Sequence, residues 1–126
     1  MEGAKANLEQ ENTAWDFDLI REKAENTWEK ELAKIEIETT DETIKTNFYT
    51  AMYHSMVAPM LAQDVNGQYR GMDKQIHKAE EAFTNYTVYS LWDTFRSLHP
   101  LMHIIDRKRS STWAKALLRK YEQGGV

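Results

Sequence analysis

The chain has 126 residues, of which 41% are hydrophobic and 29% charged, and its formal net charge is −4. This composition is typical of one soluble globular domain. It contains no cysteine, which excludes disulfides and thiolate metal sites and fits either a reducing compartment or a periplasm. No apolar run approaches the roughly 20 residues of a membrane helix, and the start lacks the apolar segment of a signal peptide, so we expect no membrane partner.

The charge is unevenly spread. Residues 1–46 hold 13 of the 20 acidic residues, whereas six basic residues and no acidic one lie between Arg107 and Lys120. On an acidic chain such a basic cluster is more often a solvated helix face than a nucleic-acid surface, so we expect no nucleic-acid partner.

The first strong pattern is an amphipathic helix from Asp16 to Ile35, with Asp16 as its N-cap. Its apolar stripe consists of Phe17, Ile20, Ala24, Trp28, Leu32 and Ile35. The preceding segment, Ala4 to Ala14, has few apolar anchors and is predicted to be a frayed lead-in or a linker.

A second helix is predicted from a cap at Thr40 or Asp41 to about Ala58, where Pro59 closes it. Apolar side chains surround more than half of this helix, so we expect it to be covered on several sides. The Asn66-Gly67 pair then predicts a tight turn, with Val65 and Tyr69 flanking it in a short hairpin. The stretch "FTNYTVYS" predicts extended chain.

Two helices follow. Ser90 is the expected N-cap of the first, which we expect to kink or break near His99 because Pro100 lacks an amide proton. Its predicted core face holds Leu91, Phe95, Leu98, Met102 and Ile105. The last helix is expected to start at Ser110 or Ser111, to end at Gly124 and to bury Trp113, Leu117, Leu118 and Tyr121.

A second, polar stripe lies beside the core face of the helix after Ser90. It contains Trp92, Arg96, His99 and His103, with Asp93 one step further round. One interpretation is an ion pair between Asp93 and Arg96 beside a surface tryptophan. The other is a sugar-binding wall, because a carboxylate accepts hydrogen bonds from paired hydroxyls and an indole covers the apolar side of a sugar ring.

Metal and acid-base chemistry have weak support. His99 and His103 have the spacing of a helical two-histidine site, but Pro100, Leu101 and Met102 stand between them where a zinc protease needs a glutamate. We therefore expect no metal site. The acidic pairs Glu36 with Glu38 and Glu80 with Glu81 indicate solvated surface rather than general acid and base.

Several segments together resemble one family. "FYTAMYHSMVAPM", "NGQYRGMD", "YSLWDTFRSLHPLMHII" and "LLRKYEQGGV" resemble, in order and spacing, the start of the catalytic domain of glycoside hydrolase family 92. The run "AKANLEQENTAWDFDLIREKAENTWEKELAKIEIE" resembles the helical connector that joins that family's N-terminal β-sandwich to its (α/α)6 barrel. The family consists of calcium-dependent exo-acting α-mannosidases, many of them α-1,2 specific.

The residue patterns predict a mainly α fold of about four helices with a short β-hairpin, and the resemblance implies that this is the start of an (α/α)6 barrel. Residues 1–38 would form the helical connector, and residues 39–126 an incomplete N-terminal portion of the barrel. Such enzymes invert the anomeric centre with an acid and a base. Their acid, base and calcium ligands come from other segments, so the resemblance implies no catalytic residue and no calcium site here and predicts that the isolated chain is inactive.

The resemblance also implies substrate-binding residues and partners. Asp93, Trp92 and Arg96 match the family's "WDTFR" element, and Tyr69, Arg70 and Asp73 are weaker candidates for the same mannose-binding wall. The expected partners are mannose-containing glycans and the rest of the same enzyme, in a periplasmic or secreted location.

A second hypothesis belongs to another class. The chain would be a free-standing helical binding or scaffold module without catalysis. In both cases we expect self-association through exposed apolar helix faces. A gene that continues past Val126 would favour the enzyme, and a stop codon there would favour the module.

Overall fold

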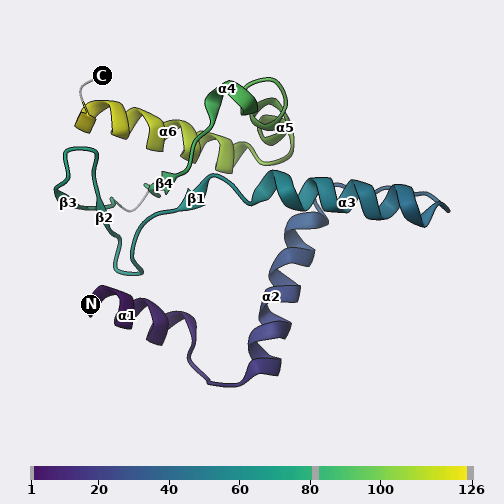
Figure 1. Cartoon of the computed structure of the whole chain (residues 1–126), viewed down its shortest axis with the longest axis horizontal. Helices are drawn as coiled ribbons and strands as arrows, with labels where there is room; N and C mark the ends of the chain where they lie inside the picture. The colour runs from purple at the N-terminus through teal and green to yellow at the C-terminus, as the bar shows by residue number, and fades with distance from the viewer. Residues whose placement is uncertain (1, 81–82, 125–126) are drawn as a thin grey trace.

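The computed structural model describes residues 2–80 and 83–124 and is mainly helical, which confirms the predicted fold class. Within these ranges the helices are α1 (Glu2–Glu11), α2 (Phe17–Leu32), α3 (Glu42–Met56), α4 (Leu91–Thr94), α5 (Leu98–Ile105) and α6 (Arg107–Gly124). The strands are β1 (Met60–Leu61), β2 (Gln68–Arg70), β3 (Ile76–Lys78) and β4 (Tyr86–Thr87). Figure 1 shows an open arrangement in which α2 and α3 extend away from the unit built around α6.

The segment expected to be a frayed lead-in is helical instead, as α1. A polar contact fastens this helix: Asn7 Nδ2 donates to Asp64 Oδ1 over 2.8 Å, and the Val65 amide donates to Asn7 Oδ1 over 3.0 Å. The prediction was wrong because it looked for apolar anchors, whereas α1 is held by hydrogen bonds to a distant loop.

The predicted cap of α2 is confirmed, and of the two candidates for α3, Thr40 and Asp41, the structure selects Asp41. Asp16 Oδ1 accepts hydrogen bonds from the Asp18 and Leu19 amides, at 3.0 and 3.2 Å. Asp41 plays the same part at the start of α3, where its Oδ1 accepts from the amides of Thr43 and Ile44. A carboxylate in this position satisfies amides that have no partner inside the helix.

The apolar faces of α2 and α3 are best covered near their C-terminal ends, where the two helices meet. There the rings of Trp28 and Tyr53 lie 4.5 Å apart, and Met52 is buried. At the other ends, Phe17 is 75% and Ile44 55% exposed. The predicted amphipathic patterns are therefore real, but much of each apolar face is solvent-exposed in this structure.

The hairpin forms one turn later than predicted. Asn66-Gly67 does make a tight turn, closed by a 2.8 Å hydrogen bond from the Gly67 amide to the Asp64 carbonyl, with φ +82° at Gly67. The antiparallel pair, however, is β2 with β3, in which Tyr69 faces His77, so Val65 is not a strand partner of Tyr69. The side chain of Asn66 accepts from the Gln68 amide, which completes the turn before β2 begins.

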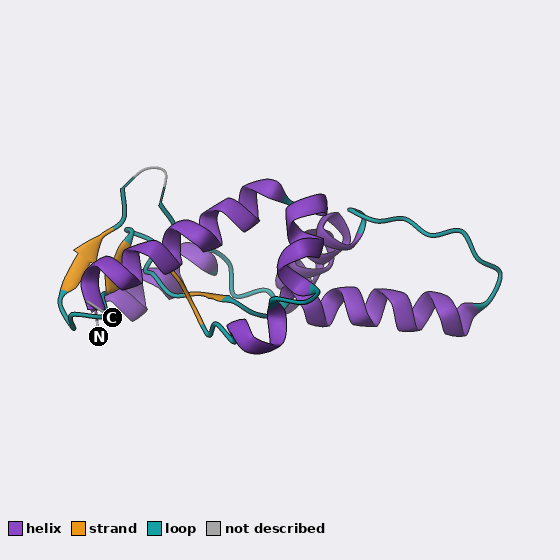
Figure 2. Ribbon diagram, turned by 90° about the horizontal axis from the view of Figure 1, so that it is seen from above, coloured by secondary structure: helices purple, strands orange, loops and turns teal. Residues whose placement is uncertain are grey.

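The extended chain predicted before Ser90 is present as β4, which pairs antiparallel with β1. This pairing brings residues 60–61 beside residues 86–87, next to α6 (Figures 1 and 2). Asn85, just before this strand, is buried and donates from Nδ2 to the Ala62 carbonyl over 2.8 Å.

The helix predicted after Ser90 is divided into α4 and α5, with the break between Thr94 and Leu98 rather than at His99 itself. Pro100 lies in the first turn of α5, where its missing amide leaves no helical hydrogen bond unmade. Because of this break the predicted core face is wrong for Leu91 and Phe95, which are 47% and 59% exposed, while Met102 is fully buried.

The last helix, α6, begins at Arg107, three residues before the predicted start. Asp106 explains the difference, because its Oδ1 accepts a 2.9 Å hydrogen bond from the Arg109 amide. Trp113 and Ala116 are its buried residues, whereas Leu118 and Tyr121, predicted to be buried, are 58% and 61% exposed. Within the described ranges no helix is both long and apolar enough to cross a membrane.

Candidate functional site

The first set of predicted site residues is carried by α4 and the turn after it. The Trp92 side chain is 80% exposed and Asp93 and Arg96 are also exposed. The hydroxyl of Ser90 donates to Asp93 Oδ2, so the expected N-cap residue fixes the carboxylate instead of capping the helix backbone.

No ion pair joins Asp93 and Arg96 in the part of the chain that the structure describes. The helix ends at Thr94, and the Arg96 guanidinium lies over the Phe95 ring, 6.0 Å from its centroid. The interpretation of this stripe as a surface ion pair is therefore wrong, and the carboxylate of Asp93 and the indole of Trp92 face solvent.

The second set lies on the β2–β3 hairpin. Tyr69 is buried, stacks on His77 at 5.7 Å between ring centroids, and accepts a 3.1 Å hydrogen bond from Gln123 Nε2. Both carboxylate oxygens of Asp73 contact His77 Nε2, at 3.0 and 2.9 Å. The amide of Gln75 and the imidazole of His77 hold the pKa of Asp73 below its usual value. Arg70 is exposed.

The structure does not bring these two sets together. The hairpin contacts the C-terminal end of α6 through Gln123, whereas Tyr89, just before α4, donates to the Trp113 carbonyl in the first half of α6. Ten helical residues separate these two points, which is about 15 Å of helix. Figure 1 shows the hairpin and α4 beside different parts of α6.

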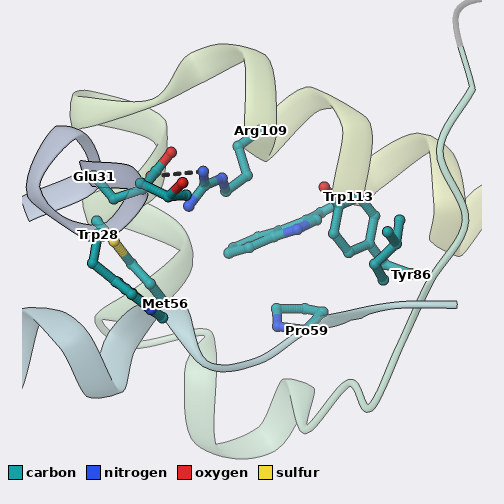
Figure 3. A pocket seen from close by; sticks show the side chains of 9 residues that line it. Trp28, Glu31, Met56, Pro59, Tyr86, Arg109 and Trp113 are labelled. Atoms are coloured by element: carbon teal, nitrogen blue, oxygen red, sulfur yellow. Dashed lines mark hydrogen bonds and ion pairs between the residues drawn. The ribbon is translucent and has the colours of Figure 1, made fainter. Parts of the chain in front are cut away.

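Sequence reasoning missed a pocket of about 480 Å³ between α2, α6 and the β1–β4 pair (Figure 3). Its wall is mainly apolar and is formed by Thr27, Trp28, Glu31, Met56, Pro59, Leu61, Tyr86, Arg109 and Trp113. Trp113 is 2% exposed, and its Nε1 has no hydrogen-bond partner among the described residues. No local pattern signals this pocket, because its walls come from five elements.

A cluster of four charges lies at the edge of this pocket and joins α2 to α6. Lys34 Nζ lies 2.6 Å from both Glu31 Oε2 and Asp106 Oδ2, and Arg109 Nη2 lies 2.7 Å from Glu31 Oε2. Glu31 with Lys34 and Asp106 with Arg109 are each three residues apart, a spacing that could have indicated two local ion pairs. The sequence does not predict that these two pairs come together in one cluster.

Partial burial and charge act in opposite directions on the two carboxylates of this cluster. Burial raises the pKa of Glu31, but the hydrogen bonds from Lys34 and Arg109 outweigh it and hold that pKa below its ordinary value of 4.5. Burial likewise raises the pKa of Asp106, but Lys34 and the Arg109 amide outweigh it and lower the pKa below 3.8. Both carboxylates are therefore ionised at neutral pH and are unsuited to general acid catalysis.

The described residues do not fit a calcium site. Calcium takes six to eight oxygen ligands, and no three histidine or acidic side chains of residues 2–80 and 83–124 converge on one point. Of the two histidines with metal-site spacing, His99 Nε2 lies 2.9 Å from Thr94 Oγ1 and His103 is exposed.

Two of three comparisons place the chain among known proteins. A sequence model described as the glycosyl hydrolase family 92 catalytic domain matches residues 3–126. Two solved structures of the family GH92 α-mannosidase BT3965 from Bacteroides thetaiotaomicron, one of them in complex with mannoimidazole, are 43% and 42% identical, each with a TM-score of 0.91 over 98% of this chain. The GH92 family glycosyl hydrolase ccman5 is 28% identical, with a TM-score of 0.88 over 99% of this chain.

The chain spans only a small part of these relatives: 16% of BT3965 and 17% of ccman5. The comparison with curated proteins gives no match. The family match covers nearly every residue, and the match to BT3965 is close in both sequence and structure. The chain therefore belongs to glycosyl hydrolase family 92, within its catalytic domain.

Proposed function

We propose that this chain is a segment of an exo-acting α-mannosidase and contributes a substrate-binding wall to it. In this proposal Trp92, Asp93 and Arg96 contact the terminal mannose of a glycan. Residues 1–38 serve as the connector, and residues 39–126 as the first part of the barrel. The acid, the base and the calcium ligands belong to other segments, so the isolated chain is inactive.

One observation carries the proposal. The short helix α4 presents an indole and a carboxylate to solvent, with the carboxylate oriented by Ser90, and the chain as a whole is 43% identical to an α-mannosidase. Indole faces and oriented carboxylates are the groups that proteins use to hold sugar rings. That a related enzyme forms a complex with mannoimidazole supports a mannose-like ligand for this family member as well.

These residues would bind and orient the sugar rather than transfer protons. The Asp93 carboxylate accepts hydrogen bonds from neighbouring sugar hydroxyls, Trp92 covers the apolar side of the ring, and Arg96 donates to a further oxygen. An inverting reaction also needs an acid and a base about 6.5 to 9.5 Å apart on opposite sides of the sugar. Holding the ring still between them lowers the barrier, because the reacting groups are already aligned.

The hairpin residues form a second part of the proposed wall. Tyr69 and Asp73 are engaged by Gln123 and His77, which leaves Arg70 as the exposed donor of this set. Because the contacts of the hairpin and of α4 lie about 15 Å apart along α6, we propose that this set, Tyr69, Arg70 and Asp73, serves a part of the glycan beyond the terminal mannose, through the exposed Arg70. Family membership also supports a periplasmic or secreted location, which fractionation of the producing cells would test.

The test is Asp93→Ala in the enzyme encoded by the gene that contains these residues. We expect kcat/KM on a terminal α-mannoside to fall at least a hundredfold while the melting temperature stays within about 2 °C, because Asp93 is exposed. Glu22→Ala, an exposed carboxylate on α2, is the control and should leave both unchanged. Wild-type turnover in Asp93→Ala would refute the proposal.

A second function rests on a different observation. Each of the described helices exposes at least one large apolar side chain, as expected of a module that binds another surface. On α3 this holds for Ile44, whereas Met52 is buried. In that case the chain would be a free-standing binding or scaffold protein. A native gene that ends at Val126 would support this function, and a gene that continues into further barrel segments would exclude it.

A further inference from the structure

The helix that carries Trp92 and Asp93 is only four residues long. So short a helix has no stability of its own, because the cost of ordering the first turn is not recovered. Its position must therefore be set by contacts at its two ends. Both ends lead to the same buried residue, Trp113 of α6.

On the upstream side, the Tyr89 hydroxyl donates a 3.2 Å hydrogen bond to the Trp113 carbonyl. Burial, followed by the charge of Tyr86, raises the pKa of Tyr89, so its phenol keeps the proton that it donates. On the downstream side, the His99 ring meets the Trp113 ring edge-on, at 5.8 Å and 83°. Trp113 is 2% exposed and so provides a fixed reference point.

Among the described residues, one side-chain hydrogen bond connects α4 to this downstream contact. Thr94, the last residue of α4, has its Oγ1 2.9 Å from His99 Nε2, and this partly buried pair spans the break between α4 and α5. Thr94 Oγ1 also lies 2.9 Å from the Ser90 carbonyl. The hydroxyl has one proton and the carbonyl can only accept, so Thr94 donates to Ser90.

It follows that His99 is the donor to Thr94, through an Nε2–H group. This assigns the tautomer of His99 from the contacts around it. The same N–H is present when the ring is protonated, so the hydrogen bond does not depend on the charge of His99. Thr94 thus receives a bond from α5 and gives one to Ser90, whose own hydroxyl orients Asp93.

We infer that Thr94 and His99 are positioning residues, which hold α4 and the sugar-binding side chains on it at a fixed place relative to Trp113. This inference rests on the proposed function of Asp93. In that proposed function neither Thr94 nor His99 contacts the sugar. Their effect passes through Ser90 and Asp93, so losing the bond loosens the wall without removing any group that contacts substrate.

The experiment uses the enzyme that contains this segment. Thr94→Val removes the hydroxyl and keeps the shape, whereas Thr94→Ser keeps the hydroxyl. His99→Phe keeps an aromatic ring against Trp113 and removes the donor. Thr112→Val is the matched control, since the Thr112 hydroxyl also donates to the carbonyl four residues before it, at 2.9 Å, but this bond lies within α6.

We expect Thr94→Val and His99→Phe each to lower kcat/KM about five- to tenfold, mostly through a higher KM, with Thr94→Ser and Thr112→Val within twofold of the unmodified enzyme. The kcat/KM of the variant that carries both substitutions should be no lower than that of the less active single variant, because both substitutions remove the same bond. In the 126-residue chain, nitrogen-15 NMR should find the His99 proton on Nε2, with its resonance shifted by Thr94→Val.

Three results would overturn the inference: two measurements of activity, which differ in what they refute, and one of the His99 tautomer. If Asp93→Ala abolishes activity but Thr94→Val equals the Thr112→Val control, the wall is real and Thr94 does not position it. If Asp93→Ala is fully active, the proposed function fails and with it the role of Thr94. A His99 proton on Nδ1 would contradict the geometry independently of any activity.

Discussion

Glu31 of α2 and Arg109 of α6 are joined by an ion pair of 2.7 Å between Oε2 and Nη2, across 78 positions of sequence. Lys34 contacts the same carboxylate and also Asp106, so that each carboxylate of the cluster has two cationic neighbours (Figure 3 shows Glu31 and Arg109). The side chains are 16% to 27% exposed. This cluster is the polar link between the proposed connector and the helix against which the rest of the chain packs.

Breaking this link should destabilise the chain. Arg109→Met keeps the length of the side chain and removes the charge, and we expect it to lower the free energy of unfolding by about 1 to 2 kcal/mol, since the pairs are only partly shielded from solvent. Arg21→Met is the control: its pairs with Asp18 and Glu25 are exposed, so its effect should stay below about 0.5 kcal/mol. Urea unfolding followed by circular dichroism measures both, and equal losses would contradict the importance of the cluster.

The same cluster predicts a pH dependence of stability. Glu31 and Asp106 have a lower pKa in the folded chain than their ordinary values of 4.5 and 3.8. The unfolded chain therefore takes up protons first as the pH falls. The stabilisation is complete near neutral pH, declines once the pH falls below about 4.5, and is lost below the folded values. Urea midpoints at pH 7 and pH 3.5 should differ more in the unmodified chain than in Glu31→Gln.

Trp113 should be the most sensitive position of the core. Trp113→Ala removes a nearly fully buried side chain and should cost about 3 to 5 kcal/mol. Trp113→Phe should cost clearly less, because the Nε1 that it removes has no partner among the described residues and no hydrogen bond is lost. Trp15→Ala, at a side chain 84% exposed, should be within about 0.5 kcal/mol of the unmodified chain. Thermal melts rank the three, and a Phe variant as damaged as the Ala variant would contradict this account.

Two residues with left-handed backbone should respond in opposite directions. Gly67 has φ +82° and Val88 has φ +61°. A β-branched residue is strained there and glycine is not, so Gly67→Ala should destabilise by about 1 kcal/mol, and Val88→Asn should stabilise by a similar amount. A Cβ at Gly67 would be no nearer than 3.8 Å to its neighbours, so its cost is conformational. Chemical denaturation measures both, and a destabilised Val88→Asn would contradict the assigned strain.

Exposed apolar side chains predict self-association of the isolated chain. Ile44 on α3 and Ile104 on α5 are 55% and 77% exposed. The double variant Ile44→Lys, Ile104→Lys should shift the chain toward monomer, whereas Thr46→Lys, which adds charge at an exposed polar position of α3, should not. Light scattering at increasing concentration is the measurement. A compact monomer for the unmodified chain at all concentrations would refute the prediction.

Local patterns were reliable where one segment of sequence carries the whole interaction. Asp16 was identifiable as a cap, and the second cap was narrowed to Thr40 or Asp41, because a cap binds amides two and three residues away. Asn66-Gly67 was identifiable as a turn for the same reason. The hairpin itself was misplaced, since the pairing of Tyr69 with His77 depends on residues beyond the turn.

The predicted sugar-binding wall also combines features that the sequence predicts with features that it does not. The sequence pointed to Trp92 and Asp93 through residue type, and both side chains are indeed exposed. It did not reveal that α4 ends at Thr94, because the continuous helical pattern through Ile105 hides a break that Pro100 permits but does not locate. The exposure of Phe95 and Leu91 follows from that break.

By itself, the sequence determined the mainly helical class, the helix cap at Asp16, a second cap at Thr40 or Asp41, the turn at Gly67 and, through its resemblance, the family. Only the tertiary structure decided that α1 is fastened by Asn7 to Asp64, and that Glu31 and Lys34 join Asp106 and Arg109 in one cluster. The reason is physical. Caps and turns satisfy backbone groups with neighbours in sequence, whereas burial and ion clusters depend on which distant surfaces meet, and no local period records that choice.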